Sequence, residues 1–216
     1  MNFGFTHLVV NGCSFTYCQG LDDPLVEGWP KLLADKLKIP LTNLALPGCG
    51  NGRILRTTTD FLYENRLRKP LYIIAFSHSS RKDEYYRNID GYKQIQVYQK
   101  PFKLLTDYEK AYIENFDTLE YSKIKARNWI NLINTFKANN IDYLTTDFIP
   151  DTTEEIETLQ LTHKHMWETI ENDVNRIENL SRITQGLKKL PCGHEDYPTM
   201  PIIADYIYKE IEKRWH

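Results

Sequence analysis

The stretch Thr6-His7-Leu8-Val9-Val10-Asn11-Gly12-Cys13-Ser14 decides how the chain is expected to fold. Its first half is apolar and β-branched, which predicts a buried strand over residues 6–10. The strand ends at Asn11-Gly12, a dipeptide typical of tight turns. Ser14 follows at once. Because functional side chains are often carried where a strand meets a loop, this junction is the first candidate location for a functional site.

The segments that follow alternate between two periodicities. Apolar residues at helical spacing predict helices, and short apolar runs predict strands. The expected helices cover about 28–37, 54–62, 121–138, 152–180 and 199–214, and the expected strands cover 41–46, 71–76 and 141–148. This alternation predicts an α/β fold, a three-layer α/β/α sandwich with a central parallel sheet. In such folds ligands bind beyond the carboxyl ends of the strands, which selects the loops 11–20, 47–53 and 76–81.

Residues 1–216 are expected to form a single domain, since that length is usual for one domain. The segment from about 81 to 120 is polar, rich in tyrosine and charge, and lacks a sustained period. It is therefore predicted to be an insertion or lid over one end of the sheet. Its tyrosines suit either a carbohydrate groove or a solvated loop, and the sequence leaves both open for Tyr85, Tyr86, Tyr92 and Tyr98.

The composition excludes several classes of partner. With 27 basic and 29 acidic residues the formal net charge is −2, which argues against nucleic acid or an anionic membrane surface. No apolar run approaches the roughly 18 residues of a membrane span, and Leu8-Val9-Val10 is too short for a signal peptide. The protein is therefore expected in the cytoplasm, with its four cysteines as reduced thiols. The oligomeric state is left open.

Three stretches carry groups suited to acyl transfer. Ser14 follows a strand, where its hydroxyl and its own N–H can face the same side. The glycine-rich run 47–52 lets backbone N–H groups approach a developing oxyanion. His194 lies in a loop before the last helix, which suits a general base held by a rigid element. Each stretch also has an ordinary explanation, as a turn serine, a tight loop and a solvated histidine.

Together these stretches resemble the SGNH/GDSL hydrolases, esterases with a flavodoxin-like fold. Gly12-Cys13-Ser14-Phe15-Thr16 looks like the family's first block, with Cys13 where an acidic residue usually stands. Asn43-Leu44-Ala45-Leu46-Pro47-Gly48 is similar to the second block, and His194 to Ala204 resembles the last. The run from Ser77 to Arg81 also resembles an SGNH-like group common in phage genomes.

The resemblance implies a serine hydrolase that cleaves a small acyl ester, for example on a carbohydrate, without a cofactor or metal. Ser14 would be the nucleophile and His194 the base. The N–H of Gly48 would hold the oxyanion, together with a side-chain donor from Ser77 or Asn51.

Two departures from the family pattern leave alternatives open. Ser77 stands where the family has an asparagine, and Pro191 occupies the usual place of the acid. Either Asp196 or Glu195 replaces that acid, or a Ser-His dyad works with a backbone carbonyl. A second possibility is a catalytically weakened SGNH-like domain that binds a carbohydrate or a protein.

The cysteines provide a rival hypothesis. The expected fold brings Cys13, Cys49 and Cys192 toward the same end of the sheet as His194, as a Cys/His metal site would require. Small buried hydrophobes are the favoured explanation for these thiols. Three arginines in the same region are candidates for holding an anionic group of a substrate, namely Arg53, Arg56 and Arg81.

Overall fold

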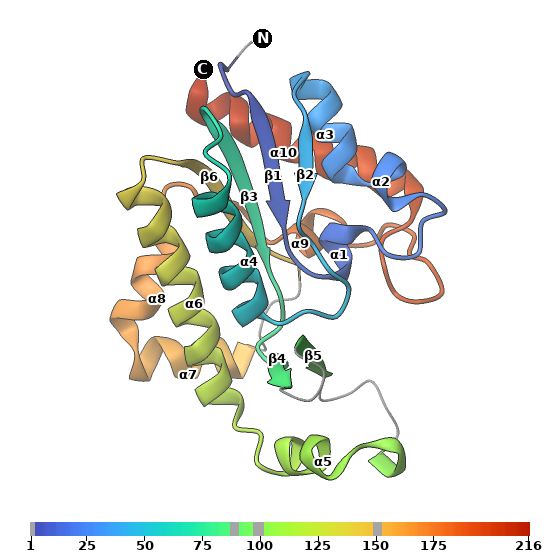
Figure 1. Cartoon of the computed structure of the whole chain (residues 1–216), viewed down its shortest axis with the longest axis vertical. Coiled ribbons are helices and arrows are strands. Elements are labelled where there is room, and N and C mark those ends of the chain that lie inside the picture. The colour runs from blue at the N-terminus through green and yellow to red at the C-terminus, as the bar shows by residue number, and fades with distance from the viewer. Residues whose placement is uncertain (1–2, 87–90, 97–101, 149–152) are drawn as a thin grey trace.

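The computed structural model describes residues 3–86, 91–96, 102–148 and 153–216. At its centre lies a parallel sheet of four strands in the order β2-β1-β3-β6. These strands are β1 (His7–Asn11), β2 (Leu41–Asn43), β3 (Pro70–Phe76) and β6 (Asp142–Asp147). Helices cover both faces of the sheet (Figure 1). The predicted α/β/α sandwich is therefore confirmed.

The helices of the described residues include several single turns that the sequence pattern did not predict. The longer helices are α3 (Trp29–Leu37), α4 (Asn51–Glu64), α5 (Asp107–Glu114), α6 (Thr118–Ala138), α7 (Thr153–Thr162), α8 (Lys164–Glu171) and α10 (Met200–Trp215). The short ones are α1 (Ser14–Tyr17), α2 (Pro24–Glu27), α9 (Leu180–Ile183) and the 3₁₀ turns η2 (Phe102–Leu104) and η3 (Tyr197–Thr199).

Two apolar cores hold the layers together, one on each face of the sheet. Successive side chains of a strand point to opposite faces, so Leu8 and Val10 enter one core while Val9 enters the other. The first core contains Trp29 of α3 and the apolar face of α10. The second core contains Trp129 of α6, which is 3% exposed. Burial of these side chains supplies the main driving force for the sandwich.

The predicted helix over 152–180 is wrong beyond residue 171. The chain forms α7 and α8, then makes a turn in which Arg176 N donates to Asp173 O at 2.8 Å, and then passes beside β6 through a single parallel bridge between Thr145 and Arg176. There Thr145 donates its N–H to Asn175 O at 3.0 Å, and Ile177 donates to Thr145 O at 2.9 Å. The side chain of Asp173 accepts from the Tyr143 hydroxyl at 3.0 Å. These tertiary bonds outweigh the local helical pattern and add one parallel bridge at the β6 edge of the four-stranded sheet.

The second strand is also shorter than the predicted 41–46. β2 ends at Asn43, whose side-chain oxygen accepts from Ala45 N at 3.0 Å. An asparagine that binds the backbone two residues on favours a turn over a continued strand. The chain nevertheless stays beside β1, since Leu44 N donates to Val10 O at 2.8 Å.

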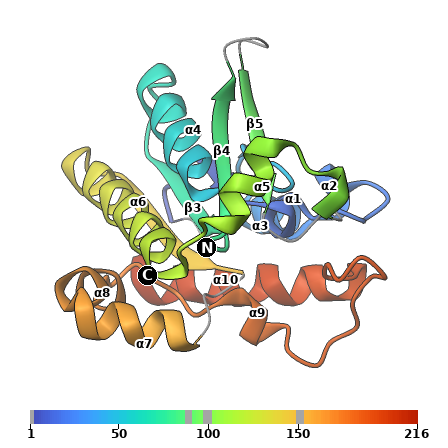
Figure 2. The same cartoon turned by 90° about the horizontal axis from the view of Figure 1, so that it is seen from below.

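The polar segment 81–120 contains regular structure that its sequence did not reveal. Strands β4 (Arg81–Tyr86) and β5 (Gly91–Gln96) form an antiparallel hairpin. Helix α5 begins with a capping box between Thr106 and Glu109. The hairpin and α5 lie across the carboxyl end of the sheet, as a view from below shows (Figure 2). Tyr98 and the side chains of Tyr85, Tyr86 and Tyr92 lie outside the described residues, so the carbohydrate groove stays a prediction.

A search of the helices in the described ranges finds none with the length and apolar character needed to cross a membrane.

Candidate active site

The three loops selected by the sequence meet at the carboxyl end of the sheet. The loop after β2 contacts the end of β1, because the Cys49 thiol donates to Gly12 O at 3.2 Å. It also contacts the end of β3, because the Asn51 side chain accepts from Ser77 N at 2.7 Å and donates to Ser77 O at 3.0 Å. A candidate site built from all three loops is therefore sterically possible.

Ser14 is the first residue of α1, a helix of a single turn. The turn forms because Thr16 and Tyr17 donate their N–H groups to Cys13 O at 3.1 and 2.9 Å. Gly12 allows the chain to enter this turn close to β3. A Cβ atom at Gly12 would lie 2.2 Å from Thr16 Oγ1 and 2.9 Å from Ala75 O. The close approach explains why glycine stands before the candidate nucleophile.

His194 lies beside the residue that follows Ser14. Its ring centroid is 4.7 Å from that of Phe15, and Phe15 in turn stacks on Phe148 at 5.5 Å. The described residues include no hydrogen bond between the Ser14 hydroxyl and the His194 ring. Such bonds are often long before substrate binds, and the structure does bring the two residues into one neighbourhood across 180 positions of sequence.

The two carboxylates near His194 have other partners. Asp196 caps η3 through a 2.7 Å bond from Tyr197 N, and its second oxygen is 3.3 Å from Lys188 Nζ. Glu195 is buried and accepts from Thr184 Oγ1 at 2.7 Å. The described hydrogen bonds join neither carboxylate to His194. The role of Asp196 as the acid therefore stays a prediction without a supporting contact.

Besides its contact with the Phe15 ring, His194 makes a polar contact with a sulfur atom. Its Nδ1 lies 3.3 Å from the Cys192 thiol. This contact orients one ring nitrogen toward Cys192 and leaves Nε2 for another partner. The sequence interpretation missed this role, although the spacing of two residues between Cys192 and His194 was a signal that could have been used.

The candidate oxyanion donors differ in what they already bind. Asn51 is 3% exposed, and its amide nitrogen donates to the carbonyls of Ser77 and His78, so it clamps the loop after β3. The Ser77 hydroxyl is buried without a hydrogen-bond partner among the described residues. Gly48 has a φ of +78°, a conformation that favours glycine. Of the two side-chain donors considered, Ser77 is the one with an unused hydroxyl.

Strand β4 packs against the glycine loop. Asp83 Oδ2 accepts from Gly50 N at 2.7 Å, and a Cβ atom at Gly50 would lie 2.4 Å from Arg81 O. Burial raises the pKa of Asp83, while the bond from Gly50 and the charges of Arg53 and Arg56 oppose that shift. The sequence pattern carried no signal for the contact between Asp83 and Gly50.

The three arginines considered as anion ligands are not equivalent. Arg53 donates to Leu44 O at 3.1 Å, so it braces the loop after β2, and Arg56 contributes to the charge around Asp83. In Arg81 one guanidinium nitrogen, Nη1, is buried and has no hydrogen-bond partner among the described residues. Arg81 is therefore the arginine best placed to bind an anionic group near His194, whose pKa it also lowers.

The cysteines divide into two groups. Cys13, Cys18 and Cys49 are buried, as expected, whereas Cys192 is exposed, which corrects the expectation of four buried thiols. Burial raises the pKa of Cys18 and of Cys49 to about 12. Among the described residues no cluster of three histidine, cysteine or acidic side chains has the arrangement of a metal site.

This difference in exposure leads to a prediction about alkylation. Brief treatment of the native protein with iodoacetamide is expected to modify Cys192 first, because the thiolate reacts and the other thiols are shielded. Peptide mass spectrometry would locate the adduct, and Cys192→Ser should remove the fast reaction. Fast modification of Cys13 or Cys49 would show that the loops at the sheet edge open in solution.

Among the comparisons with known proteins, only that with solved structures gives matches, and these concern the fold. No family model matches the chain, and no curated protein sequence matches it. Among solved structures, the esterase EstA from Pseudoalteromonas sp. has a TM-score of 0.61 at 17% identity, with 96% of this chain and 97% of that chain covered. A putative lipolytic protein of the G-D-S-L family from Desulfitobacterium hafniense has a TM-score of 0.57 at 13% identity, covering 95% and 99%.

A third similar structure is an acetyl xylan esterase, Est2A, from Butyrivibrio proteoclasticus. Its TM-score is 0.58 at 8% identity, with 98% of this chain and 65% of that chain covered. At these identities the likeness concerns the backbone arrangement. The resemblance seen in the sequence blocks is thus confirmed for the architecture, and the chain has the fold of the SGNH/GDSL esterases.

Proposed function

We propose that this protein is an ester hydrolase in which Ser14 is the nucleophile and His194 the general base. The observation that carries the proposal is the contact between the rings of His194 and Phe15, at 4.7 Å. It brings an imidazole beside the N-terminus of α1, where Ser14 stands. The similar fold of known esterases supports the same assignment. Because one fold hosts many functions, the fold would not be sufficient without the contact at the site.

The proposed reaction has two halves. His194 takes the proton of the Ser14 hydroxyl as Oγ attacks the ester carbonyl, and then gives it to the departing alcohol. Water deprotonated by the same imidazole releases the acid from the acyl-enzyme. The N–H groups of Ser14 and Gly48 and the hydroxyl of Ser77 would hold the negative oxygen in both tetrahedral intermediates.

Cys192 takes the place beside Nδ1 that an acid holds in a full triad. Its sulfur, 3.3 Å from Nδ1, is a weak acceptor compared with a carboxylate. It holds the ring orientation, but it stabilises the imidazolium less than a negative charge would. The enzyme is therefore proposed to be slower than an esterase with a complete Ser-His-Asp triad.

The proposed substrate is a small acyl ester, with an acetylated carbohydrate as the favoured class. The acetyl xylan esterase with a similar fold supports this choice. We further propose that the substrate carries a negative group close to the ester, such as a uronic acid carboxylate, because Arg81 Nη1 is buried and has no hydrogen-bond partner among the described residues. The carboxylate would pair with Arg81 while the ester faces Ser14.

A serine-directed fluorophosphonate probe tests the proposed nucleophile. The wild-type protein is expected to gain one covalent label at Ser14, found by peptide mass spectrometry, and Ser14→Ala is expected to gain none. His165→Ala is a suitable control, because the side chain of His165 is fully exposed. Equal labelling of the wild type and Ser14→Ala, or labelling at another residue, would reject the assignment and favour a binding module.

The environment of His194 predicts how the activity falls as the pH is lowered. Burial, and after it the positive charge of Arg81, lowers the pKa of His194; Glu195 raises this pKa and Lys189 lowers it further. The neutral imidazole is the active base, so it persists to lower pH than in a free histidine. Activity should fall only below the ordinary histidine range, and Arg81→Gln should move the fall to higher pH.

The profile of kcat/KM against pH measures this effect with p-nitrophenyl acetate, a substrate without a charge to contact Arg81. Lys188→Gln is the matched control, because Lys188 pairs with Asp196 and its side chain is 83% exposed. An unshifted profile in Arg81→Gln would mean that Arg81 does not act on the catalytic base.

A further inference from the structure

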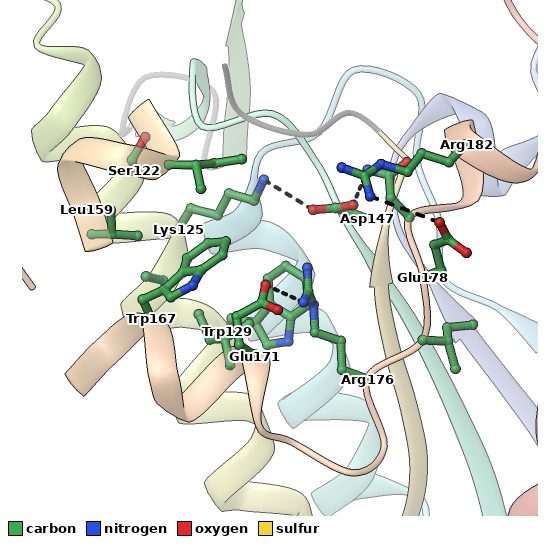
Figure 3. Close-up of a pocket in the computed structure, with 15 residues that line it drawn as sticks. Ser122, Lys125, Trp129, Asp147, Leu159, Trp167, Glu171, Arg176, Glu178 and Arg182 are labelled. Atoms are coloured by element: carbon green, nitrogen blue, oxygen red, sulfur yellow. Dashed lines mark hydrogen bonds and ion pairs between the residues drawn. The ribbon is translucent and has the colours of Figure 1, made fainter. Parts of the chain in front are cut away.

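A cavity of about 400 Å³ lies between α6, α7, α8 and the segment that follows α8. It is lined by side chains of these elements, by Asp147 at the end of β6 and by Arg182 of α9 (Figure 3). Its size is within the range of pockets that hold small molecules. The candidate active site does not use any of its lining residues.

The cavity borders the core on the α6 face of the sheet, to which its lining residues Ala126, Trp129 and Leu159 belong. Along β6 the side chains alternate between the two faces. Asp147 lines the cavity, whereas the next residue, Phe148, belongs to the opposite core and stacks on Phe15. A ligand in this cavity would therefore lie mainly against the α6 side, and neither Ser14 nor His194 is among the lining residues.

Arg176 is held in the cavity wall by aromatic rings. Its guanidinium carbon is 5.7 Å from the ring centroid of Trp129 and 6.0 Å from that of Trp167. Glu171 pairs with its Nη1. The other face of Trp129 stacks on Phe76 at 4.4 Å, so the arrangement has little freedom to shift. Such cation–π contacts favour a charged group at a fixed position.

The acceptors that line the cavity are already engaged. Asp147 accepts from the Asn179 amide and lies 3.9 Å from Lys125 Nζ. Glu178 Oε1 lies 4.0 Å from Arg182 Nη1, and Glu171 forms an ion pair with Arg176. The carboxylates therefore offer little to a ligand that would bring hydrogen-bond donors or a positive charge.

Several hydrogen-bond donors that line the cavity, unlike its carboxylates, have no partner within the described ranges. Among the residues that line the cavity, three buried donor atoms have no hydrogen-bond partner in the described part of the chain, namely Ser122 Oγ, Trp129 Nε1 and Arg176 Nε. Buried donors are costly when left unpaired, so a wall with several of them is complementary to a group that supplies acceptor oxygens.

We propose that this cavity is a second binding site, specific for a small oxyanion such as a carboxylate or a phosphate ester. The charged group of the ligand would accept from Trp129 Nε1 and Arg176 Nε, and the guanidinium would supply the charge. Ser122 lies about two helical turns from Trp129 on α6, so its hydroxyl would donate to another oxygen of the same ligand. The site is independent of ester hydrolysis, and it does not need Ser14 or His194.

Titration calorimetry with named probes tests the site. Inorganic phosphate, glucose 6-phosphate and citrate are the anionic probes, and glucose is the neutral one. Saturable binding of glucose 6-phosphate or phosphate without citrate would identify a phosphate ligand, and the reverse a carboxylate ligand. Glucose is expected not to bind. Absence of saturable binding by all three anions at millimolar concentration would overturn the proposal.

Variants locate the binding. Ser122→Ala and Trp129→Phe each remove one unpaired donor, and Arg176→Lys removes Nε, so each should weaken binding about tenfold. Arg127→Gln is the control, because Arg127 lies on the same helix with a side chain that is 56% exposed. Ser14→Ala should bind as the wild type does. Equal affinity of the wild type and Ser122→Ala, with both folded by circular dichroism, would place the anion elsewhere and reject the site.

Discussion

Ser14→Ala and His194→Ala are each expected to lower kcat for p-nitrophenyl acetate by at least about 10³-fold. In the proposed mechanism the two side chains share one proton transfer, so neither retains its function without the other. The double variant should therefore be no slower than the slower single variant, apart from background hydrolysis. Steady-state rates of the four proteins, measured at one pH, give the comparison.

This double-mutant cycle distinguishes a shared proton transfer from independent contributions of Ser14 and His194. If Ser14 and His194 acted separately, their effects on the activation free energy would add, and the double variant would be far slower than either single variant. His165→Ala should retain the wild-type rate, because the side chain of His165 is fully exposed. A wild-type rate in Ser14→Ala would end the proposal of a serine esterase.

Gly50→Ala is expected to destabilise the protein by about 1–3 kcal/mol and to remove most of its activity. The new Cβ would lie 2.4 Å from Arg81 O and 2.9 Å from Asp83 Oδ2. Both atoms belong to β4, so the strand and the glycine loop must move apart. The bond from Gly50 N to Asp83 would weaken at the same time. Urea unfolding and esterase rates measure the two effects.

Gly52→Ala is the matched control two residues away. Gly52 belongs to helix α4, and apart from its chain neighbours and the nearby backbone of that helix no atom of the described residues lies within 4 Å of the position where its Cβ would be. Alanine is the better helix former, so this variant should be as stable as the wild type or more stable by up to about 1 kcal/mol. Equal stability of Gly50→Ala and the wild type would show that the loop is not packed against β4 in solution.

The strands of the sheet were predictable because their burial leaves a plain trace in the sequence. β1 and β3 contain short apolar runs, and all seven residues of β3 are buried, whereas β6 is apolar only at Tyr143 and Leu144. The segment after α8 was not predictable in the same way. Its polar residues continue a helix-like pattern, and bonds to Tyr143, Thr145 and Thr146 of β6 hold it against the sheet. Local pattern does not record such long-range pairing.

The candidate site divides along similar lines. The loops that carry Ser14, the glycine run and Ser77 follow from strand order, since carboxyl ends of parallel strands share one edge. The partners of individual atoms do not follow from it. Asn51 was expected as an oxyanion donor, but its amide clamps Ser77 and His78. The contacts of Cys192 with His194 and of Asp83 with Gly50 depend on how loops pack, which one sequence does not reveal.

The segment beside β6 also bears on how the molecule behaves at high concentration. Arg214 of α10 donates to Val174 O at 3.1 Å and to Arg176 O at 3.3 Å, which ties that segment to the C-terminal helix. At the far side of the sheet, β2 is only three residues long. Unpaired backbone at a sheet border is a template on which other chains add and aggregate. With one border covered and the other short, the protein should resist that route to fibres.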